Sequence, residues 1–183
     1  MLIDHQREKL IHSIIYFANK TQHFHKIKLC KLLYFLDFEH YKQTGRCVTG
    51  LEYYAWPMGP VPVSIYNEID SPKPDLLNNI SFKEVNIKKG KMLEVIPLVN
   101  FESKFFSKRE INILESLAIE FHDTLAENMV EATHLENQPW YKIYHEQKQK
   151  QQIIPYDLAI RKQEVGELQK VVKERDELIR HFS

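Results

Sequence analysis

The chain has 183 residues, 43% of them hydrophobic, which is enough for one domain, or one domain with an appendage, to bury a proper core. Its 25 acidic residues balance its 25 lysines and arginines, which disfavours a protein that binds nucleic acid through phosphate contacts. Two cysteines without a CxxC pair, a polar N-terminus and no apolar run of about 18 residues favour a cytoplasmic protein without a signal peptide or membrane span.

The first 45 residues predict two helices. Apolar residues at helical spacing predict an amphipathic helix over residues 4–19, with Asp4 as its N-cap. Over residues 26–45 the apolar side chains cover almost every face, which is typical of a buried helix. Gly45 is well placed to end this second helix, which we expect to be the centre of the core.

The stretch YYAWPMGPVP, residues 53–62, holds three aromatic residues, three prolines and one glycine. Alternation over residues 51–56 predicts a short strand. Pro60 and Pro62 suit the first turn of a helix over residues 61–69, where a missing N–H costs little. Because each proline fixes φ at about −65°, we expect a rigid turn from strand to helix.

A period of two over residues 82–98, interrupted by the turn KKGK, predicts a β-hairpin. An isolated two-stranded hairpin is marginally stable. We therefore expect this hairpin to pack on helices or to pair with the strand at residues 51–55.

Two capping boxes predict further helix starts. SKRE at residues 107–110 opens one helix, and TLAE at residues 124–127 opens another that runs to about Ala132. Pro139 and Trp140 are expected to lie outside the regular helix.

The last segment predicts a long helix with a heptad-like apolar stripe that Arg175 interrupts. The stripe consists of Val165, Leu168, Val172, Ile179 and Phe182. Because an isolated helix of this length is marginal, the stripe needs a partner, which can be its own domain, a second copy or another protein.

Together these elements predict an α+β protein that is mainly α: a helical domain around a buried central helix, with a small antiparallel sheet or hairpin and a long C-terminal helix. The expected division is a domain at residues 1–160 and a helical extension at residues 161–183.

The usual motifs of catalysis and phosphate binding, including GxSxG and HExxH, are absent. His23 and His25 lie two apart, but without a third ligand we interpret them as loop histidines, and we expect no metal or cofactor. Asp37 and His40, three apart on one helix, could form an acid–base site with the distant His134. The favoured interpretation is a hydrogen-bonded pair on the core helix plus a histidine at a helix end.

Two groups of lysines stand out: Lys26, Lys28 and Lys31, and Lys88, Lys89 and Lys91. Neither group carries interleaved exposed aromatic residues, so we interpret both as solubilising charge rather than a nucleic-acid patch. Cys30, inside the central helix, is interpreted as a small core residue rather than a nucleophile.

Three sequence pieces in a fixed order carry a resemblance: KLLYFLDF at 31–38, RCVTGLEYYAWPMGPVP at 46–62 with IYNEI following at 65–69, and EATHLENQPW at 131–140. The combination resembles the Panacea domain, the SocA-like antitoxin family often labelled phage-associated, over about residues 10–160. The matching positions are Lys31, Leu32, Leu33 and Tyr34; Thr49, Gly50, Tyr53, Ala55, Trp56, Gly59, Pro60 and Val61; and His134 and Trp140. Met58 departs from the pattern, because an aromatic residue is common there.

The resemblance implies a non-enzymatic, prophage-associated antitoxin that neutralises a cognate protein toxin by direct contact. Delivery of the toxin to a protease, DNA-binding regulation, a homodimer through the C-terminal helix and a hydrolase using the acid–base residues remain alternatives. The candidate partner-binding residues are Tyr34, Tyr54, Trp56, Met58, Gly59, Pro60, Val61, His134, Trp140 and Tyr141. For Trp56 and Trp140 the competing interpretation is that they fill the core.

Overall fold

The computed structural model describes residues 4–87, 90–135, 138–161 and 164–182. The helices are α1 (Gln6–Lys20), α2 (Lys26–Thr44), α3 (Val63–Glu68), α4 (Pro74–Leu77), α5 (Lys108–Glu120), α6 (Ala126–Thr133), α7 (Pro139–Tyr141) and α8 (Val165–Phe182). The strands are β1 (Tyr54–Trp56), β2 (Gly59–Val61), β3 (Ile80–Ile87) and β4 (Gly90–Pro97). Short 3₁₀ turns span Ser103–Phe105 and Tyr156–Ala159, and a π-helical turn spans Lys142–Glu146. The α+β, mainly α fold class is thus confirmed.

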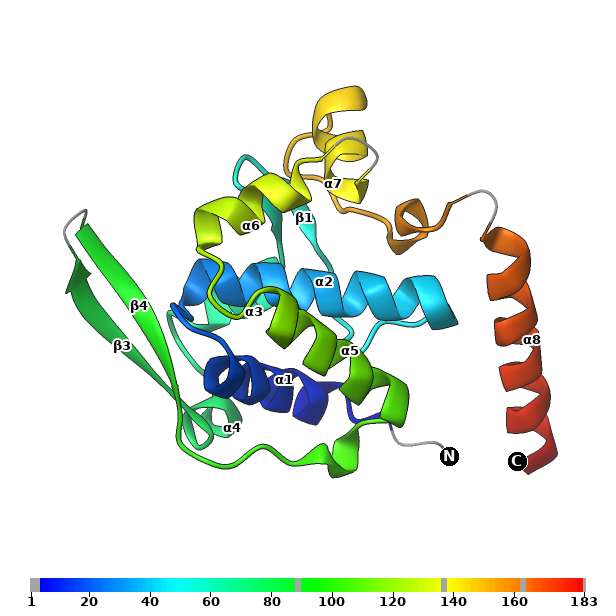
Figure 1. Ribbon diagram of the computed structural model, residues 1–183, viewed down its shortest axis with the longest axis horizontal. Coiled ribbons are helices and arrows are strands. Elements are labelled where there is room, and N and C mark those ends of the chain that lie inside the picture. The colour runs from blue at the N-terminus through cyan, green and yellow to red at the C-terminus, as the bar shows by residue number, and fades with distance from the viewer. Residues whose placement is uncertain (1–3, 88–89, 136–137, 162–163, 183) are drawn as a thin grey trace.

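Helix α2 runs through the middle of the molecule, with α1 and α5 on one side and α6, α7 and β1 on the other (Figure 1). Leu29, Leu32 and Leu36 on this helix are 0% exposed. Gly45 ends the helix in the left-handed conformation, with φ of 69°, and its N–H donates to the Tyr41 carbonyl. The prediction of a buried central helix ending at this glycine is confirmed.

Two of the three predicted helix caps are wrong. Helix α1 begins at Gln6 after His5 and has no side-chain cap; Asp4 instead lies 3.5 Å from the Arg46 guanidinium. Helix α6 begins after Leu125, again without a side-chain cap. Thr124 lies one residue too early, in a loop whose carbonyl groups point at Lys28.

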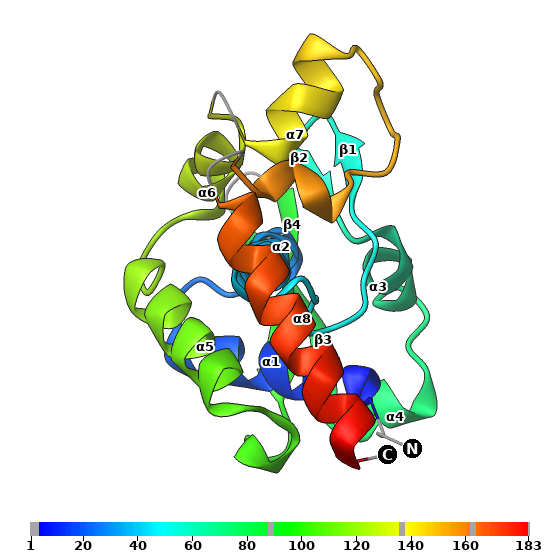
Figure 2. The ribbon, with the colours of Figure 1, turned by 90° about the vertical axis from the view of Figure 1, so that its right-hand side faces the viewer.

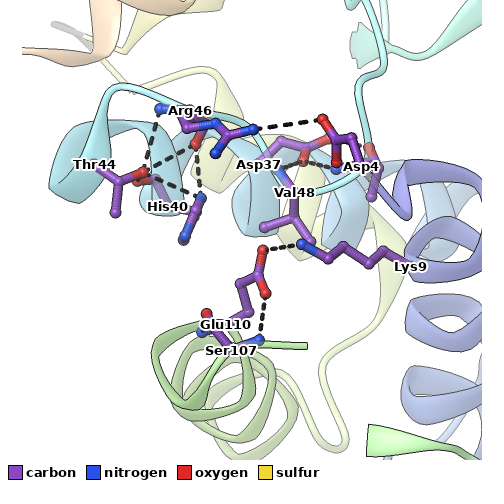
Figure 3. A network of polar contacts seen from close by, with 10 residues as sticks. Asp4, Lys9, Asp37, His40, Thr44, Arg46, Val48, Ser107 and Glu110 are labelled. Atoms are coloured by element: carbon purple, nitrogen blue, oxygen red, sulfur yellow. Dashed lines mark hydrogen bonds and ion pairs between the residues drawn. The ribbon is translucent and has the colours of Figure 1, made fainter. Parts of the chain in front are cut away.

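The capping box of α5 is confirmed. The Ser107 hydroxyl accepts from the Glu110 N–H at 3.3 Å, and the Glu110 carboxylate accepts from the Ser107 N–H at 2.6 Å. The other oxygen of the same carboxylate pairs with Lys9 of α1 at 2.7 Å, so the cap also ties α5 to α1 (Figure 3).

The strands form two separate antiparallel hairpins, β1–β2 and β3–β4. Pairing of Trp56 with Gly59 makes YYAWPMGPVP a tight β-hairpin, so the predicted direct turn from strand to helix is wrong; α3 begins only at Val63. The free edge of β1 is covered by residues 151–154, because the Ala55 N–H donates to the Gln152 carbonyl at 2.9 Å.

The β3–β4 hairpin lies where the period of two predicts it, pairing Ile80 with Pro97 at one end and Ile87 with Gly90 at the other. It packs on α1 and α2 rather than on β1, and its far end projects from the helices (Figure 1). Of the two expectations for its packing, the helices are the correct one.

Helix α8 crosses the C-terminal end of α2 (Figures 1 and 2). Leu168 and Val172 lie against Gly45: a Cβ placed on this glycine would be 3.7 Å and 3.0 Å from their methyl groups. Leu168 and Val172 of the apolar stripe therefore pack on their own domain, whereas Val165 and Ile179 of the same stripe are 40% and 36% exposed. No helix in the described ranges has the length and apolar character to cross a membrane.

Candidate functional site

The β1–β2 hairpin is attached to the helices on both sides by hydrogen bonds to its backbone. The Lys31 ammonium of α2 donates to the Pro60 carbonyl at 3.0 Å. The Trp140 indole N–H of α7 donates to the Trp56 carbonyl at 2.8 Å. Each strand is thus bonded to a different helix, which fixes the position of the hairpin.

Gly59 is the point of closest approach in this arrangement. Its φ is +97°, which L side chains rarely adopt. A Cβ there would lie 2.6 Å from the Lys31 Nζ and 2.7 Å from the Thr133 hydroxyl. The absence of a side chain therefore lets α2 and α6 both reach the hairpin backbone.

Trp140 is a core residue, with 1% of its surface exposed. His134 stacks on one side of the indole, with ring centroids 3.7 Å apart and planes within 7°, and Tyr144 stacks on it at 4.7 Å. Pro139 and Trp140 lie outside α6, as expected, and begin a short helix of their own, α7. Pro139 occupies the first turn of α7, where a proline costs no hydrogen bond.

The ten candidate partner-binding residues divide into an enclosed group and a surface group. The enclosed residues are Tyr34, Gly59, Pro60, Val61 and Trp140. Met58 is 56% exposed, and Tyr54, Trp56, His134 and Tyr141 are half-buried. The half-buried Trp56 packs edge-on against Tyr66 at 5.4 Å, so it contacts the domain without being fully covered.

Sequence reasoning missed two exposed apolar residues beside this group. Ile153 is 44% exposed and pairs with Tyr54 across the edge of β1. Leu135 is 59% exposed and directly follows His134. Neither carries a sequence signal: Ile153 reaches the edge of β1 only through the fold, and Leu135 is next to a histidine whose ring stacks on the distant Trp140. We call Tyr54, Trp56, Met58, Leu135 and Ile153 the hairpin face.

Asp37 and His40 do not form the predicted pair (Figure 3). The buried Asp37 carboxylate accepts from the Val48 and Thr49 N–H groups at 2.7 and 2.8 Å, from the Tyr53 hydroxyl at 2.7 Å and from the Thr49 hydroxyl. Burial raises the pKa of Asp37, and these hydrogen bonds oppose that shift.

The imidazole of His40 instead donates to the Arg46 carbonyl at 2.7 Å. His134 is stacked on Trp140. The three proposed acid–base residues are therefore separately engaged. Asp37 joins α2 to the chain that leads into β1, which is a structural role.

Two lysines of the predicted solvated group are buried. Lys28 and Lys31 are 0% and 1% exposed, whereas Lys26 forms an ion pair with Asp70 at 2.7 Å. Their burial follows from the all-round enclosure of α2. Burial also lowers the pKa of Lys31 to about 8. Cys30 between them is 2% exposed, which confirms it as a core residue, and burial raises its pKa to about 12.

Among the residues that the structure describes, no three histidine, cysteine, aspartate or glutamate side chains are placed to hold a metal ion. His23, in the loop before α2, is exposed and has φ of 53°. Burial lowers the pKa of its neighbour His25.

The fold and the site thus define a mainly helical domain that holds an aromatic, proline-rich hairpin rigidly at its surface. A family model for the SocA-like antitoxins, the Panacea domain, matches residues 29–141, more than half of the chain. The protein therefore belongs to the SocA-like, Panacea-domain antitoxin family. No curated protein and no solved structure matches the chain. The matched range runs from α2 to the end of α7 and includes Lys31, Gly59 and Trp140.

Proposed function

We propose that this protein is an antitoxin of a prophage-associated toxin–antitoxin system, and that it neutralises a cognate protein toxin in the cytoplasm by direct contact through the hairpin face. Membership of the SocA-like family supports a protein partner. The observation that carries the proposal is Met58, which is 56% exposed at the tip of a hairpin whose two strands are each bonded to a helix.

A rigid apolar projection suits protein binding for an energetic reason. Ordering side chains and loops on association costs about 0.5–1.5 kcal/mol per immobilised side chain. The hairpin is already fixed by Pro60, by its ladder and by the Trp140 hydrogen bond. Little free energy is therefore spent on ordering the hairpin tip when a partner binds it. Aromatic residues such as Trp56 and Tyr54 are also enriched among the residues that anchor protein interfaces.

A binding role without catalysis is supported by the way the titratable groups are used. Asp37 is saturated by donors, and His40 is bonded to the Arg46 carbonyl. Neither is left free to exchange protons with a substrate, which is what an acid–base catalyst must do.

The test is co-expression with the product of the adjacent reading frame in a bacterial host. We expect that product to arrest growth alone, and growth to return with the wild-type protein. Met58→Glu should abolish the rescue, because a carboxylate at the tip makes an apolar contact unfavourable. Ile119→Glu is the matched control, because Ile119 is 79% exposed on α5 and lies outside the hairpin face.

A harmless neighbour, or full rescue by Met58→Glu, contradicts this proposal. The level of toxin in rescued cells separates the mechanisms. An undiminished level that copurifies with the antitoxin supports occlusion, whereas a level restored only by removal of a host protease identifies the protein as an adaptor. Retention on duplex DNA that falls steeply with salt identifies a regulator.

A further inference from the structure

Two lysines of α2 are buried one turn apart, but only one of them has a complete set of hydrogen bonds. The Lys28 ammonium donates to the carbonyl groups of Gln22, His122 and Thr124 at 2.8, 3.3 and 2.8 Å. It therefore uses all three of its donors. The Lys31 ammonium donates to the Pro60 carbonyl alone, and no carboxylate among the described residues pairs with it.

Two other polar groups without hydrogen-bond partners converge on the same place. The Tyr34 hydroxyl is buried on the same side of α2 as Lys31, and its O–H has no acceptor among the described residues. Burial raises the pKa of Tyr34, and the neighbouring backbone of Trp140 opposes that shift. The His134 Nε2 is likewise buried and unpaired, on the ring that stacks on Trp140. Burial lowers the pKa of the His134 imidazole, and the nearby charge of Lys31 adds to that shift.

The cluster of Lys31, Tyr34 and His134 has an excess of donors. Among the described residues, two ammonium N–H groups and one phenol O–H find no acceptor, and the imidazole can supply one more donor. An ionised carboxylate is acceptor-only, with about four lone-pair sites, and it carries the charge that an ammonium lacks. A phosphate is a poorer match, because it would bring more charge and more oxygens than these donors can pair.

We propose that the cluster of Lys31, Tyr34 and His134 is a binding site for a single carboxylate, supplied by an aspartate, glutamate or C-terminus of the protein partner. The assignment of the carboxylate to a toxin rests on the proposed function. The site itself does not, because it follows from the unpaired donors.

The site lies directly beneath the hairpin face. Lys31 is separated from the surface by Gly59, whose neighbour Met58 is exposed. His134 is followed by the exposed Leu135. A partner seated on the hairpin face is therefore one residue layer away from the donors.

The first experiment tests the site with acetate as the carboxylate probe. Melting temperature is measured at pH 7 in sodium acetate and in sodium chloride of equal ionic strength. We expect acetate to raise the melting temperature of the wild-type protein in a concentration-dependent manner. The increase should disappear in Lys31→Met and shrink in Tyr34→Phe, both of which keep the shape of the side chain they replace. Equal responses to the two salts, or an acetate response that survives Lys31→Met, overturn the site.

Two controls exclude other origins of the response. Lys28→Gln should keep the acetate response even though it is less stable, because Lys28 already has three acceptors. Glu136→Gln removes the carboxylate that lies two residues after His134 in the sequence. If this variant binds acetate where the wild type does not, the site belongs to the protein's own Glu136, and the partner proposal is wrong.

The second experiment tests the partner. Loss of one charge-assisted hydrogen bond, worth about 1.5–3 kcal/mol, corresponds to an affinity for the toxin about 10- to 100-fold weaker in Lys31→Met. The melting temperature of this variant, measured alongside, separates this effect from the loss of the Lys31–Pro60 hydrogen bond, which by itself lowers stability. Unchanged affinity overturns the role of the site in toxin binding. If the wild-type protein fails to rescue growth while the acetate response persists, the proposed function fails and the carboxylate site stands.

Discussion

The indole N–H of Trp140 donates to the backbone carbonyl of Trp56 at 2.8 Å, which joins two residues 84 positions apart in the chain. The bond places α7 against β1, and with it the His134 ring that stacks on Trp140. Trp140 is enclosed and Trp56 is half-buried. One tryptophan therefore holds the hairpin in place, and the other presents part of its ring to the surface.

Trp140→Phe should destabilise the protein by about 2–3 kcal/mol, because it leaves the Trp56 carbonyl without a donor and opens a small cavity. Trp56→Phe is the matched comparison. The Trp56 ring is half-buried, and the substitution leaves the Trp56 carbonyl unaffected. We therefore expect it to lower the free energy of unfolding by less than about 1 kcal/mol. Urea denaturation followed by circular dichroism measures both. Equal losses would mean that the hydrogen bond contributes nothing to the free energy of unfolding.

Gly59→Ala should lower the free energy of unfolding by more than about 2 kcal/mol. An L residue is strained at positive φ, and its methyl group would displace the Lys31 ammonium. Gly166→Ala in α8 is the control: its Cβ meets no atom within 4 Å, so the helix should gain about 0.5–1 kcal/mol. Thermal unfolding of the two variants should shift in opposite directions. A neutral Gly59→Ala would contradict the close approach of α2 to the hairpin.

Lys31 should make the protein more stable at alkaline pH. Its pKa is about 8 in the folded state against 10.5 in the unfolded chain. Between these values the unfolded chain binds more protons, so the free energy of unfolding rises with pH, by at most about 3 kcal/mol. Below pH 8 both states are protonated, and this contribution is absent.

Lys31→Met isolates this effect, because it removes the titrating group and leaves the other lysines and tyrosines in place. The difference in unfolding free energy between Lys31→Met and the wild type should shift in favour of the wild type as the pH rises from about 8 to about 10. Denaturant titrations at several pH values measure it. A pH-independent difference would show that the buried ammonium carries no electrostatic cost.

Deletion of the chain after Arg161 removes α8 and tests the predicted division at residue 160. Leu168 and Val172 are only half-buried against the end of α2. We expect the shortened protein to fold, to lose about 1–2 kcal/mol of stability and to keep its mass in solution and its neutralising activity. A lower oligomeric mass on gel filtration with light scattering would instead assign α8 to self-association.

The structural features that are local in sequence were predictable. The apolar residues of 26–45 cover all faces and make α2 the core helix, and the SKRE box starts α5 through contacts within one turn. The β3–β4 hairpin follows from its period of two. The order of the three motif pieces predicted the family.

The features that depend on distant contacts were not predictable from the residues alone. Thr124 carries the chemistry of a cap, but the loop that supplies carbonyl groups to Lys28 moves the start of α6 beyond it. Asp37 is close to His40 on the helix, yet the loop at Val48 and Thr49 offers it better donors. In both places a tertiary hydrogen bond outweighs a weak local preference.

The sequence by itself determined the composition of this core, its central helix and its family, because apolar periodicity and motif order are properties of a linear chain. Only the tertiary structure decided which polar groups are paired, because pairing depends on what other segments bring near. Lys28 and Lys31 look alike in the sequence. The fold surrounds the Lys28 ammonium with three carbonyl groups and the Lys31 ammonium with one. Among the described residues, the other two N–H groups of Lys31 therefore have no acceptor.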